Sequence, residues 1–297
     1  MITSLRKQKG RGKEKDMKKI IVTGCNGQLG RAINLRYAQN KEYELINTDV
    51  EQLDITAIDK VMSYARQVQP YAIINCAAYT AVEACEKEED LAFRINAIGA
   101  RNLAIAANET GAKLVHVSTD YVFAGDGTRP YIETDKTGPQ GAYGRTKLAG
   151  EEFVKEFCDR HFIVRTAWLY GDGKNFVKTM LRLAQTNDKV RVVKDQVGSP
   201  TSASELARAI AYLLPTENYG LFHGTCEGDC SWADFAREIF RLAGQKTEVE
   251  GITSEEYGAA VKRPACSILE NYMLKMTTDF MFQDWHEAIE EYIKSIV

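Results

Sequence analysis

A short β-branched segment that runs directly into a glycine-rich turn and then a helix is the feature that most constrains this fold. Residues 18–23 read KKIIVT, and residues 24–30 read GCNGQLG, with glycine at every third position. Residues 31–37 then have helical periodicity. This order predicts a phosphate site, because glycines let the backbone approach a pyrophosphate closely and a helix N-terminus attracts an anion. A turn that serves packing alone is the alternative.

Strand-like and helical segments continue to alternate after this unit. Strand-like runs at 43–49, 72–78 and 113–117 are separated by helical stretches at 56–69 and 90–110. This alternation predicts an α/β fold with a doubly wound, mainly parallel sheet of the Rossmann type. Ligands of such sheets bind beyond the carboxyl ends of the strands. The residues that fall at these ends are Gly24, Asp49, Cys76, Ala77, Ala78, Ser118 and Thr119.

The chain shows no clean linker, so two interleaved parts are expected. We predict a dinucleotide-binding domain at 17–173 and a smaller lobe, mainly for substrate, at 174–297. A segment at about 198–226 is expected to return to the first domain. Residues 1–16 carry six Lys/Arg against two Asp/Glu, a charge of +4 that leaves −7 for the remainder. They are predicted to form a disordered basic tail, with the fold starting at Met17.

Composition argues against several classes of protein. The chain of 297 residues is 44% apolar and 27% charged, as in soluble globular proteins. A net charge of −3 points to neither a nucleic-acid nor a membrane partner, and no apolar run approaches the length of a membrane span. The seven cysteines lack the dense spacing of a secreted scaffold, which favours a reducing cytoplasm. Cys226 and Cys230 lack a second ligand pair, so no metal site is predicted.

An acidic residue near the end of the second strand bears on the choice of cofactor. Asp49 lies 25 residues after Gly24. A carboxylate at this place accepts hydrogen bonds from an adenosine ribose and repels a 2′-phosphate, which favours NADH over NADPH. A contact from the neighbouring Thr48 and a loop-capping role for Asp49 are the alternatives.

Tyr143 and Lys147 are the residues on which the chemistry is expected to centre. The residues that follow them have helical periodicity, so the two side chains share one helix face. An ammonium group one turn away stabilises a phenolate and lowers its pKa from about 10. The Thr119 hydroxyl, at a strand end, can donate to a carbonyl oxygen that Tyr143 protonates. A tyrosine that only packs and a threonine that only binds backbone are the alternatives.

Together these motifs resemble the extended short-chain dehydrogenase/reductase family. A narrower similarity, to the dTDP-4-dehydrorhamnose reductases, covers about residues 17–297. The motifs of the wider family are TGxxGxxG at 23–30, NCAA at 75–78, STDYVF at 118–123 and YxxxK at 143–147. Those of the narrower group are TDYVF at 119–123, YGRTKLAGE at 143–151, RTAWLYG at 165–171, DQxGxPT at 195–201 and RPxxS at 263–267.

The resemblance implies that Thr119, Tyr143 and Lys147 are catalytic. Tyr143 would protonate the C4 carbonyl oxygen of a nucleotide-sugar, Lys147 would hold the nicotinamide ribose, and Thr119 would orient the carbonyl. The residues implied to contact NADH (favoured) or NADPH are Gly24, Asn26, Gly27, Gln28, Leu29, Asp49, Asp54, Ile55, Cys76, Ala77, Ala78, Tyr143 and Lys147. Those implied to contact the substrate are Ser118, Thr119, Trp168, Arg263 and Ser267. A core role for Trp168 and a surface role for Arg263 stay open.

Two other functions remain alternatives. One is another nucleotide-sugar enzyme of the same family, an epimerase or a dehydratase. A dehydratase would need an acid–base carboxylate beside Thr119, and Asp120 is adjacent. A regulatory subunit that binds dinucleotide without turnover would not need Thr119, Tyr143 and Lys147 together. His116, inside an apolar run, is predicted to lie in the core. Some relatives form homodimers through a metal-bridged interface, but no glutamate here can be assigned to that role.

Overall fold

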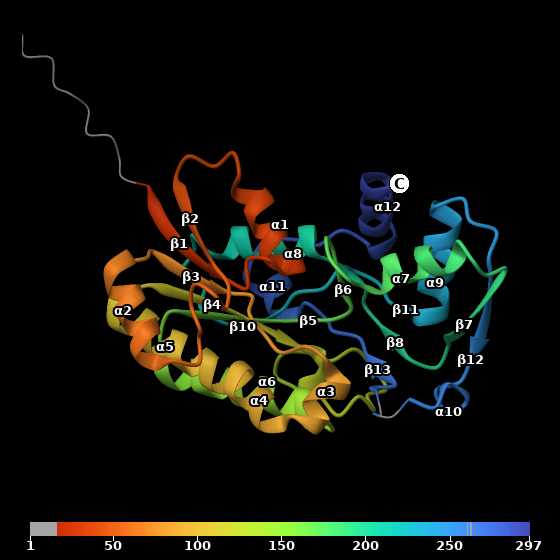
Figure 1. Ribbon diagram of the computed structural model, residues 1–297, viewed down its shortest axis with the longest axis horizontal. Coiled ribbons are helices and arrows are strands. Elements are labelled where there is room, and N and C mark those ends of the chain that lie inside the picture. Colours follow the sequence, from red (N-terminus) through yellow and green to blue (C-terminus); the bar gives the residue numbers. More distant parts are fainter. Residues whose placement is uncertain (1–16, 260, 262) are drawn as a thin grey trace, which may run out of the picture.

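Six parallel strands form the centre of the molecule (Figure 1). This computed structural model describes residues 17–259, 261 and 263–297, so the predicted basic tail lies outside it. The strand order is β10-β5-β4-β3-β1-β2, and every neighbouring pair is parallel. The prediction of a doubly wound, mainly parallel sheet is therefore confirmed. The strands are β1 (Lys18–Thr23), β2 (Tyr43–Thr48), β3 (Ala72–Asn75), β4 (Lys113–Thr119), β5 (His161–Thr166) and β10 (Gly220–His223).

Helices cover both faces of this sheet, because its strands are apolar on both sides. Alternate residues of β1 face opposite ways: Ile20 and Val22 join one core cluster, and Ile21 joins the other. The first cluster includes α1 (Gln28–Tyr37) and α8 (Ala203–Leu213). The second includes α2 (Ile58–Val68), α5 (Gly99–Thr110) and α6 (Ala142–Phe157).

A short π-helical turn before α5 ties α6 to a loop near the strand ends. This turn, Arg94–Ile98, follows α3 (Val82–Lys87) and α4 (Glu89–Phe93). Its buried Asn96 donates to Thr146 Oγ1 of α6 and to the carbonyl of Tyr79, and its oxygen accepts from the Tyr79 N–H. The loop that follows β3 is thereby held beside α6.

A smaller lobe lies beside the sheet, at the right of Figure 1. Its apolar cluster joins α7 (Phe176–Ala184), α9 (Trp232–Leu242) and α12 (Trp285–Ile296). The two parallel strands β7 (Lys189–Val193) and β12 (Glu248–Ile252) pair in this lobe. The remaining elements of the chain are a 3₁₀ turn (Asp120–Val122), β6 (Leu169–Tyr170), β8 (Val197–Gly198), β9 (Thr201–Ser202), β11 (Cys230–Ser231), α10 (Ser254–Tyr257), β13 (Cys266–Ser267) and α11 (Tyr272–Thr277).

The segment at about 198–226 is expected to return to the first domain. Within it, α8 packs in the first core cluster against the sheet, and β10 is a strand of the sheet. The division of the chain into two domains stays a prediction.

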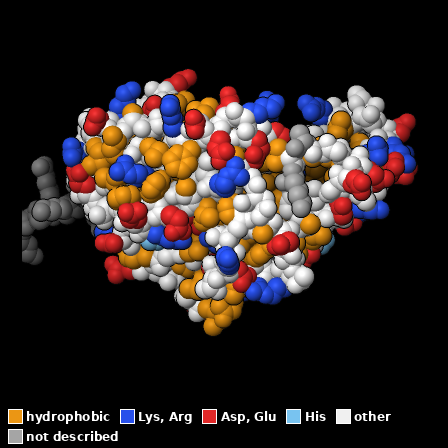
Figure 2. All heavy atoms as spheres, turned by 90° about the horizontal axis from the view of Figure 1, so that it is seen from below, with side chains coloured by type: hydrophobic (Ala, Val, Ile, Leu, Met, Phe, Trp, Pro, Cys, Tyr) orange, Lys and Arg blue, Asp and Glu red, His pale blue; other side chains and the backbone are white. Residues whose placement is uncertain are grey.

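Acidic and basic side chains are intermixed over the face seen in Figure 2. Over the described part of the chain, no helix has both the length and the apolar character needed to cross a membrane.

A fully buried ion pair fixes α6 against the sheet. Glu151 of α6 accepts hydrogen bonds from Arg165 of β5, at 2.9 Å from Nε and 2.7 Å from Nη2. The Ser118 hydroxyl of β4 donates to the same carboxylate at 2.5 Å. The two charged side chains are 0% and 2% exposed. Removal of one charge would leave the other buried without compensation, which is strongly destabilising.

We therefore expect Glu151→Gln to lower the free energy of unfolding by about 3 kcal/mol, measured by urea denaturation. Glu109→Gln is the control, because it breaks the exposed Arg66–Glu109 pair and should leave the midpoint unchanged. Equal midpoints for Glu151→Gln and the unmodified protein would show that the buried pair contributes no stability.

Candidate active site

A cavity of about 500 Å³ opens at the carboxyl ends of the strands, which is where ligands of such sheets bind. The glycine turn, the loop after β3, the end of β4, α6 and the segment after β5 all contribute to its wall. The residues that line it include Gly27, Gln28, Leu29, Cys76, Ala78, Ser118, Thr119, Asp120, Tyr121, Tyr143, Lys147, Thr166 and Trp168.

The glycine turn is shaped for close backbone contacts. Gly24 has a φ of +63°, and a Cβ there would lie 2.8 Å from the Ala77 backbone. A Cβ on Gly30 would lie 2.4 Å from the Gly24 carbonyl oxygen. The N-cap of α1 is Gly27, so no side chain satisfies the N–H groups of its first turn. Free N–H groups at a helix N-terminus, reached through glycines, fit the pyrophosphate of a dinucleotide.

Asp49 lies beside this turn, where its carboxylate accepts from the backbone N–H of Asn26 at 3.3 Å and of Val50 at 2.9 Å. Asp54 and Ile55 are not among the cavity-lining residues. The Asp54 carboxylate binds the backbone and hydroxyl of Thr56, and Ile55 is buried in the second core cluster. A cofactor contact for these residues stays a prediction.

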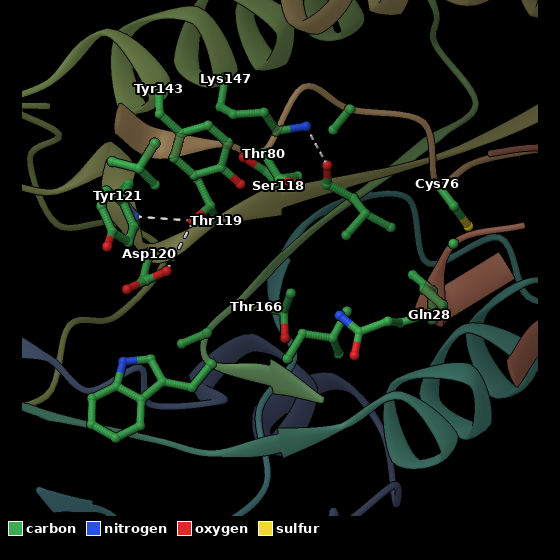
Figure 3. A pocket seen from close by; sticks show the side chains of 18 residues that line it. Gln28, Cys76, Thr80, Ser118, Thr119, Asp120, Tyr121, Tyr143, Lys147 and Thr166 are labelled. Carbon is green, nitrogen blue, oxygen red and sulfur yellow. Dashed lines mark hydrogen bonds between the residues drawn. The ribbon is translucent and has the colours of Figure 1, made fainter. Parts of the chain in front are cut away.

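The three predicted catalytic side chains are brought together in the cavity (Figure 3). Tyr143 and Lys147 lie one turn apart on α6, and Thr119 ends β4. Because α6 packs against β4 and β5, both α6 side chains point toward the strand end. Catalytic roles for the three residues stay a prediction.

Lys147 is buried at the base of the cavity. Its amine donates to the Val117 carbonyl at 2.6 Å and lies 3.5 Å from His116 Nε2. Burial lowers the pKa of Lys147 to about 8, although the Glu151 carboxylate one turn further along α6 acts to raise it. Burial and the Lys147 charge in turn hold the pKa of His116 well below its usual range. His116 is a core residue, as the sequence predicts.

The pKa of Tyr143 is raised, and the expectation that Lys147 lowers it is wrong for this structure. Burial has the largest effect, a hydrogen bond with Thr119 opposes it, and the Asp120 charge adds to it. Lys147 does not produce the expected lowering, because its amine is directed to a backbone carbonyl of β4 (Figure 3). In this environment the phenol keeps its proton at neutral pH.

Asp120 belongs to the site, although the sequence suggested it only for an alternative function. The Thr119 hydroxyl donates to Asp120 Oδ1 at 2.9 Å and accepts from the Tyr121 N–H at 3.2 Å. Asp120 is 4% exposed, and burial raises its pKa to about 7. The expected donation from Thr119 to a ketone stays a prediction. The position of Asp120 directly after Thr119, at the end of a strand, is the sequence feature that could have indicated its place in the site.

A smaller cavity of about 150 Å³ adjoins the first, and Asp120, Tyr121 and Trp168 line both. Arg263, predicted to bind a substrate phosphate, also lines the smaller cavity. Its guanidinium pairs with the Glu83 carboxylate of α3 at 2.6 Å. A contact between Arg263 and a phosphate would therefore compete with this ion pair.

The indole of Trp168 is held between the two cavities. It stacks on Trp232, with ring centroids 3.4 Å apart, and its Nε1 donates to Ser267 Oγ at 3.1 Å. Its φ of +48° is uncommon for a bulky residue. Trp232 was missed by the sequence analysis, because the Ser231–Trp232 pair indicated only a helix start. The structure thus gives Trp168 both a packing partner and a place on the cavity wall.

Comparisons with known proteins show similarity over nearly the whole described chain. The model of the family described as "RmlD substrate binding domain" matches residues 17–297. The spore coat polysaccharide biosynthesis protein SpsK of Bacillus subtilis is 40% identical, covering 94% of this chain and 98% of its own. A dTDP-4-dehydrorhamnose reductase from Clostridium acetobutylicum is 52% identical, with a TM-score of 0.92 over 94% of this chain and 99% of its own. The Bacillus anthracis reductase of the same name, solved with NADP, is 44% identical, with a TM-score of 0.92 over 94% of this chain and 100% of its own.

The tight approach of Gly30 to Gly24 predicts that Gly30→Ala destabilises the fold. We expect a loss of about 1–3 kcal/mol in urea denaturation, despite the higher helix propensity of alanine, because the added Cβ must displace backbone. Gly138→Ala is the control, since its Cβ would only reach ordinary contact, 3.6 Å from Ala124 Cβ. If both variants unfold at the same urea concentration, the turn tolerates a side chain and the close approach does not constrain it.

Proposed function

The chain belongs to the RmlD substrate binding domain family, and on that basis we propose that it reduces the C4 ketone of dTDP-4-dehydro-L-rhamnose to give dTDP-L-rhamnose, using NADH or NADPH. The observation that carries this proposal is the meeting of Tyr143, Lys147 and Thr119 in one cavity that begins at the glycine turn. The reductases of Clostridium acetobutylicum and Bacillus anthracis, similar over 94% of this chain, support it.

The residues around the turn and α6 would hold the cofactor. A bound nicotinamide dinucleotide supplies the hydride that the ketone carbon receives. Its pyrophosphate would lie on the N-terminus of α1, and Asp49 would face its adenosine ribose. The Lys147 ammonium has three donors, of which one is used by Val117 at 2.6 Å. It therefore keeps donors for the hydroxyls of a nicotinamide ribose.

Tyr143 would deliver the proton. Because burial raises its pKa, the phenol is protonated at neutral pH, and it can give this proton to the oxygen that gains negative charge as the ketone is reduced. Thr119, beside it, would be the second donor to the same oxygen.

The seven cysteines are all free thiols, which is typical of proteins in a reducing compartment. We therefore propose that the protein acts in the cytoplasm.

One observation favours a second candidate function. A nucleotide-sugar dehydratase needs a carboxylate for acid–base work, and Asp120 lies in the cavity beside Thr119. The identity of the product separates the two candidates. Oxidation of NADH or NADPH in step with formation of dTDP-L-rhamnose supports the reductase, whereas consumption of a sugar nucleotide without net oxidation of the dinucleotide supports the alternative.

Replacement of the Tyr143 hydroxyl should stop proton delivery without disturbing the cofactor. We expect Tyr143→Phe to lower kcat by about 10²–10⁴-fold, measured as dinucleotide oxidation on addition of dTDP-4-dehydro-L-rhamnose. The Kd for the dinucleotide, measured by calorimetry, should stay within about twofold. Tyr212→Phe, on an exposed part of α8, is the control. A Tyr143→Phe enzyme within a few-fold of the original kcat would remove Tyr143 from the mechanism.

The position of Asp49 leads us to propose a preference for NADH. Asp49→Asn removes the charge that would repel a 2′-phosphate, so the ratio of kcat/KM for NADPH to that for NADH should rise by roughly tenfold, equivalent to about 1.4 kcal/mol. Glu51→Gln removes an exposed charge two residues away and should leave the ratio unchanged. A ratio that does not move in Asp49→Asn would place the ribose contact elsewhere, with Thr48 the nearest candidate.

A further inference from the structure

The Thr119 hydroxyl has one proton, which it can donate either to the Asp120 carboxylate or to an oxygen in the reaction centre. We propose that Asp120 is a positioning residue whose protonation state decides whether Thr119 donates to Asp120 or into the reaction centre. This inference rests on the proposed function, since it concerns the same ketone reduction. The inference adds to the proposed function a group, Asp120, that controls when the Thr119 hydroxyl can donate to the ketone oxygen.

The hydrogen bonds of Thr119 define the state with a charged Asp120. A hydroxyl has one donor and two acceptor positions. In the structure its oxygen accepts from the Tyr121 N–H at 3.2 Å and its proton is directed to Asp120 Oδ1 at 2.9 Å (Figure 3). A carboxylate offers only acceptors, so this proton has no competing use while Asp120 is charged. Thr119 then has nothing to donate to a developing oxyanion.

The neutral acid reverses this arrangement. A protonated carboxyl group gains one O–H donor, which can be given to Thr119 Oγ1. The Thr119 proton is then free to turn toward the neighbouring Tyr143 phenol or toward a ketone oxygen beside it. The only net event is the uptake of one proton from solvent by the carboxylate. The hydroxyl rotates, and no other bond forms or breaks.

The surroundings of Asp120 make both states accessible near neutral pH. The residue is 4% exposed, and its Oδ2 has no hydrogen-bond partner in the described ranges. Burial raises its pKa to about 7, and the hydrogen bond from Thr119 acts to lower it. Because Asp120 lines both cavities, a proton can reach it from either side.

Few charged or titratable groups face this carboxyl group. Tyr143 of α6 and Tyr121 lie beside it, and burial keeps both phenols neutral by raising their pKa. Arg263 lies across the smaller cavity, where its charge is paired with Glu83 at 2.6 Å. No cation forms an ion pair with Asp120 among the residues described, so its titration is set mainly by burial.

The test compares the pH dependence of kcat in four proteins with saturating substrate and dinucleotide. In the unmodified enzyme, kcat should fall by about tenfold between pH 6 and pH 8, as a group with a pKa of about 7 loses its proton. Asp120→Asn carries an amide that can donate to Thr119 but does not titrate, so this fall should be absent whatever its absolute kcat. Thr119→Ser keeps a hydroxyl and should keep the fall, whereas Thr119→Val should lose it.

A fall that persists in Asp120→Asn would overturn the proposal and assign the titration to another group, with Lys147 the first candidate. A large rise in KM with an unchanged pH profile would also overturn it, because Asp120 would then bind the sugar directly. Infrared difference spectra of the unmodified protein against Asp120→Asn give a readout without turnover. A carboxylic acid band that disappears between pH 6 and pH 8 supports the proposal, and a carboxylate at every pH refutes it. Absence of any turnover in the unmodified enzyme would instead refute the proposed function.

Discussion

The buried contact between Glu151 and Arg165 is the interaction on which the geometry of the cavity depends. Glu151 lies four residues after Lys147 and eight after Tyr143, so the three side chains share one face of α6. Anchoring of Glu151 to β5, and to Ser118 of β4, turns this face toward the strand ends. Lys147 and Tyr143 must then face the cavity. The hydrogen bonds from two neighbouring strands to one carboxylate hold the helix in this orientation.

The burial that fixes these side chains also sets their proton affinities. Burial disfavours the charged form of any group, so it raises the pKa of acids and lowers the pKa of bases. Tyr143 accordingly keeps its proton, the pKa of Asp120 rises to about 7, and the pKa of Lys147 falls to about 8. Burial therefore keeps the Tyr143 phenol protonated at neutral pH. It also brings the pKa values of Asp120 and Lys147 close to neutral pH.

The wall opposite α6 comes from segments far apart in the sequence. Trp168 stacks on Trp232, from α9 of the smaller lobe, and binds Ser267. Arg263 reaches Glu83, at the edge of the sheet domain. The cavity thus lies where the smaller lobe meets the strand ends. Its shape depends on how the two parts pack, and a substrate that contacts both would bridge them.

The sequence by itself determined the parts that depend on local order. The strand, glycine turn and helix at 18–37 predict the first unit of the sheet, and the four-residue spacing of Tyr143 and Lys147 places them on one helix face. Only the tertiary structure decided that the pKa of Tyr143 is raised, and that the Thr119 hydroxyl donates its proton to Asp120. Periodicity and spacing report which residues are neighbours along an element. The proton affinity of a side chain depends instead on burial and on partners brought together by packing, which the order of residues along the chain does not reveal.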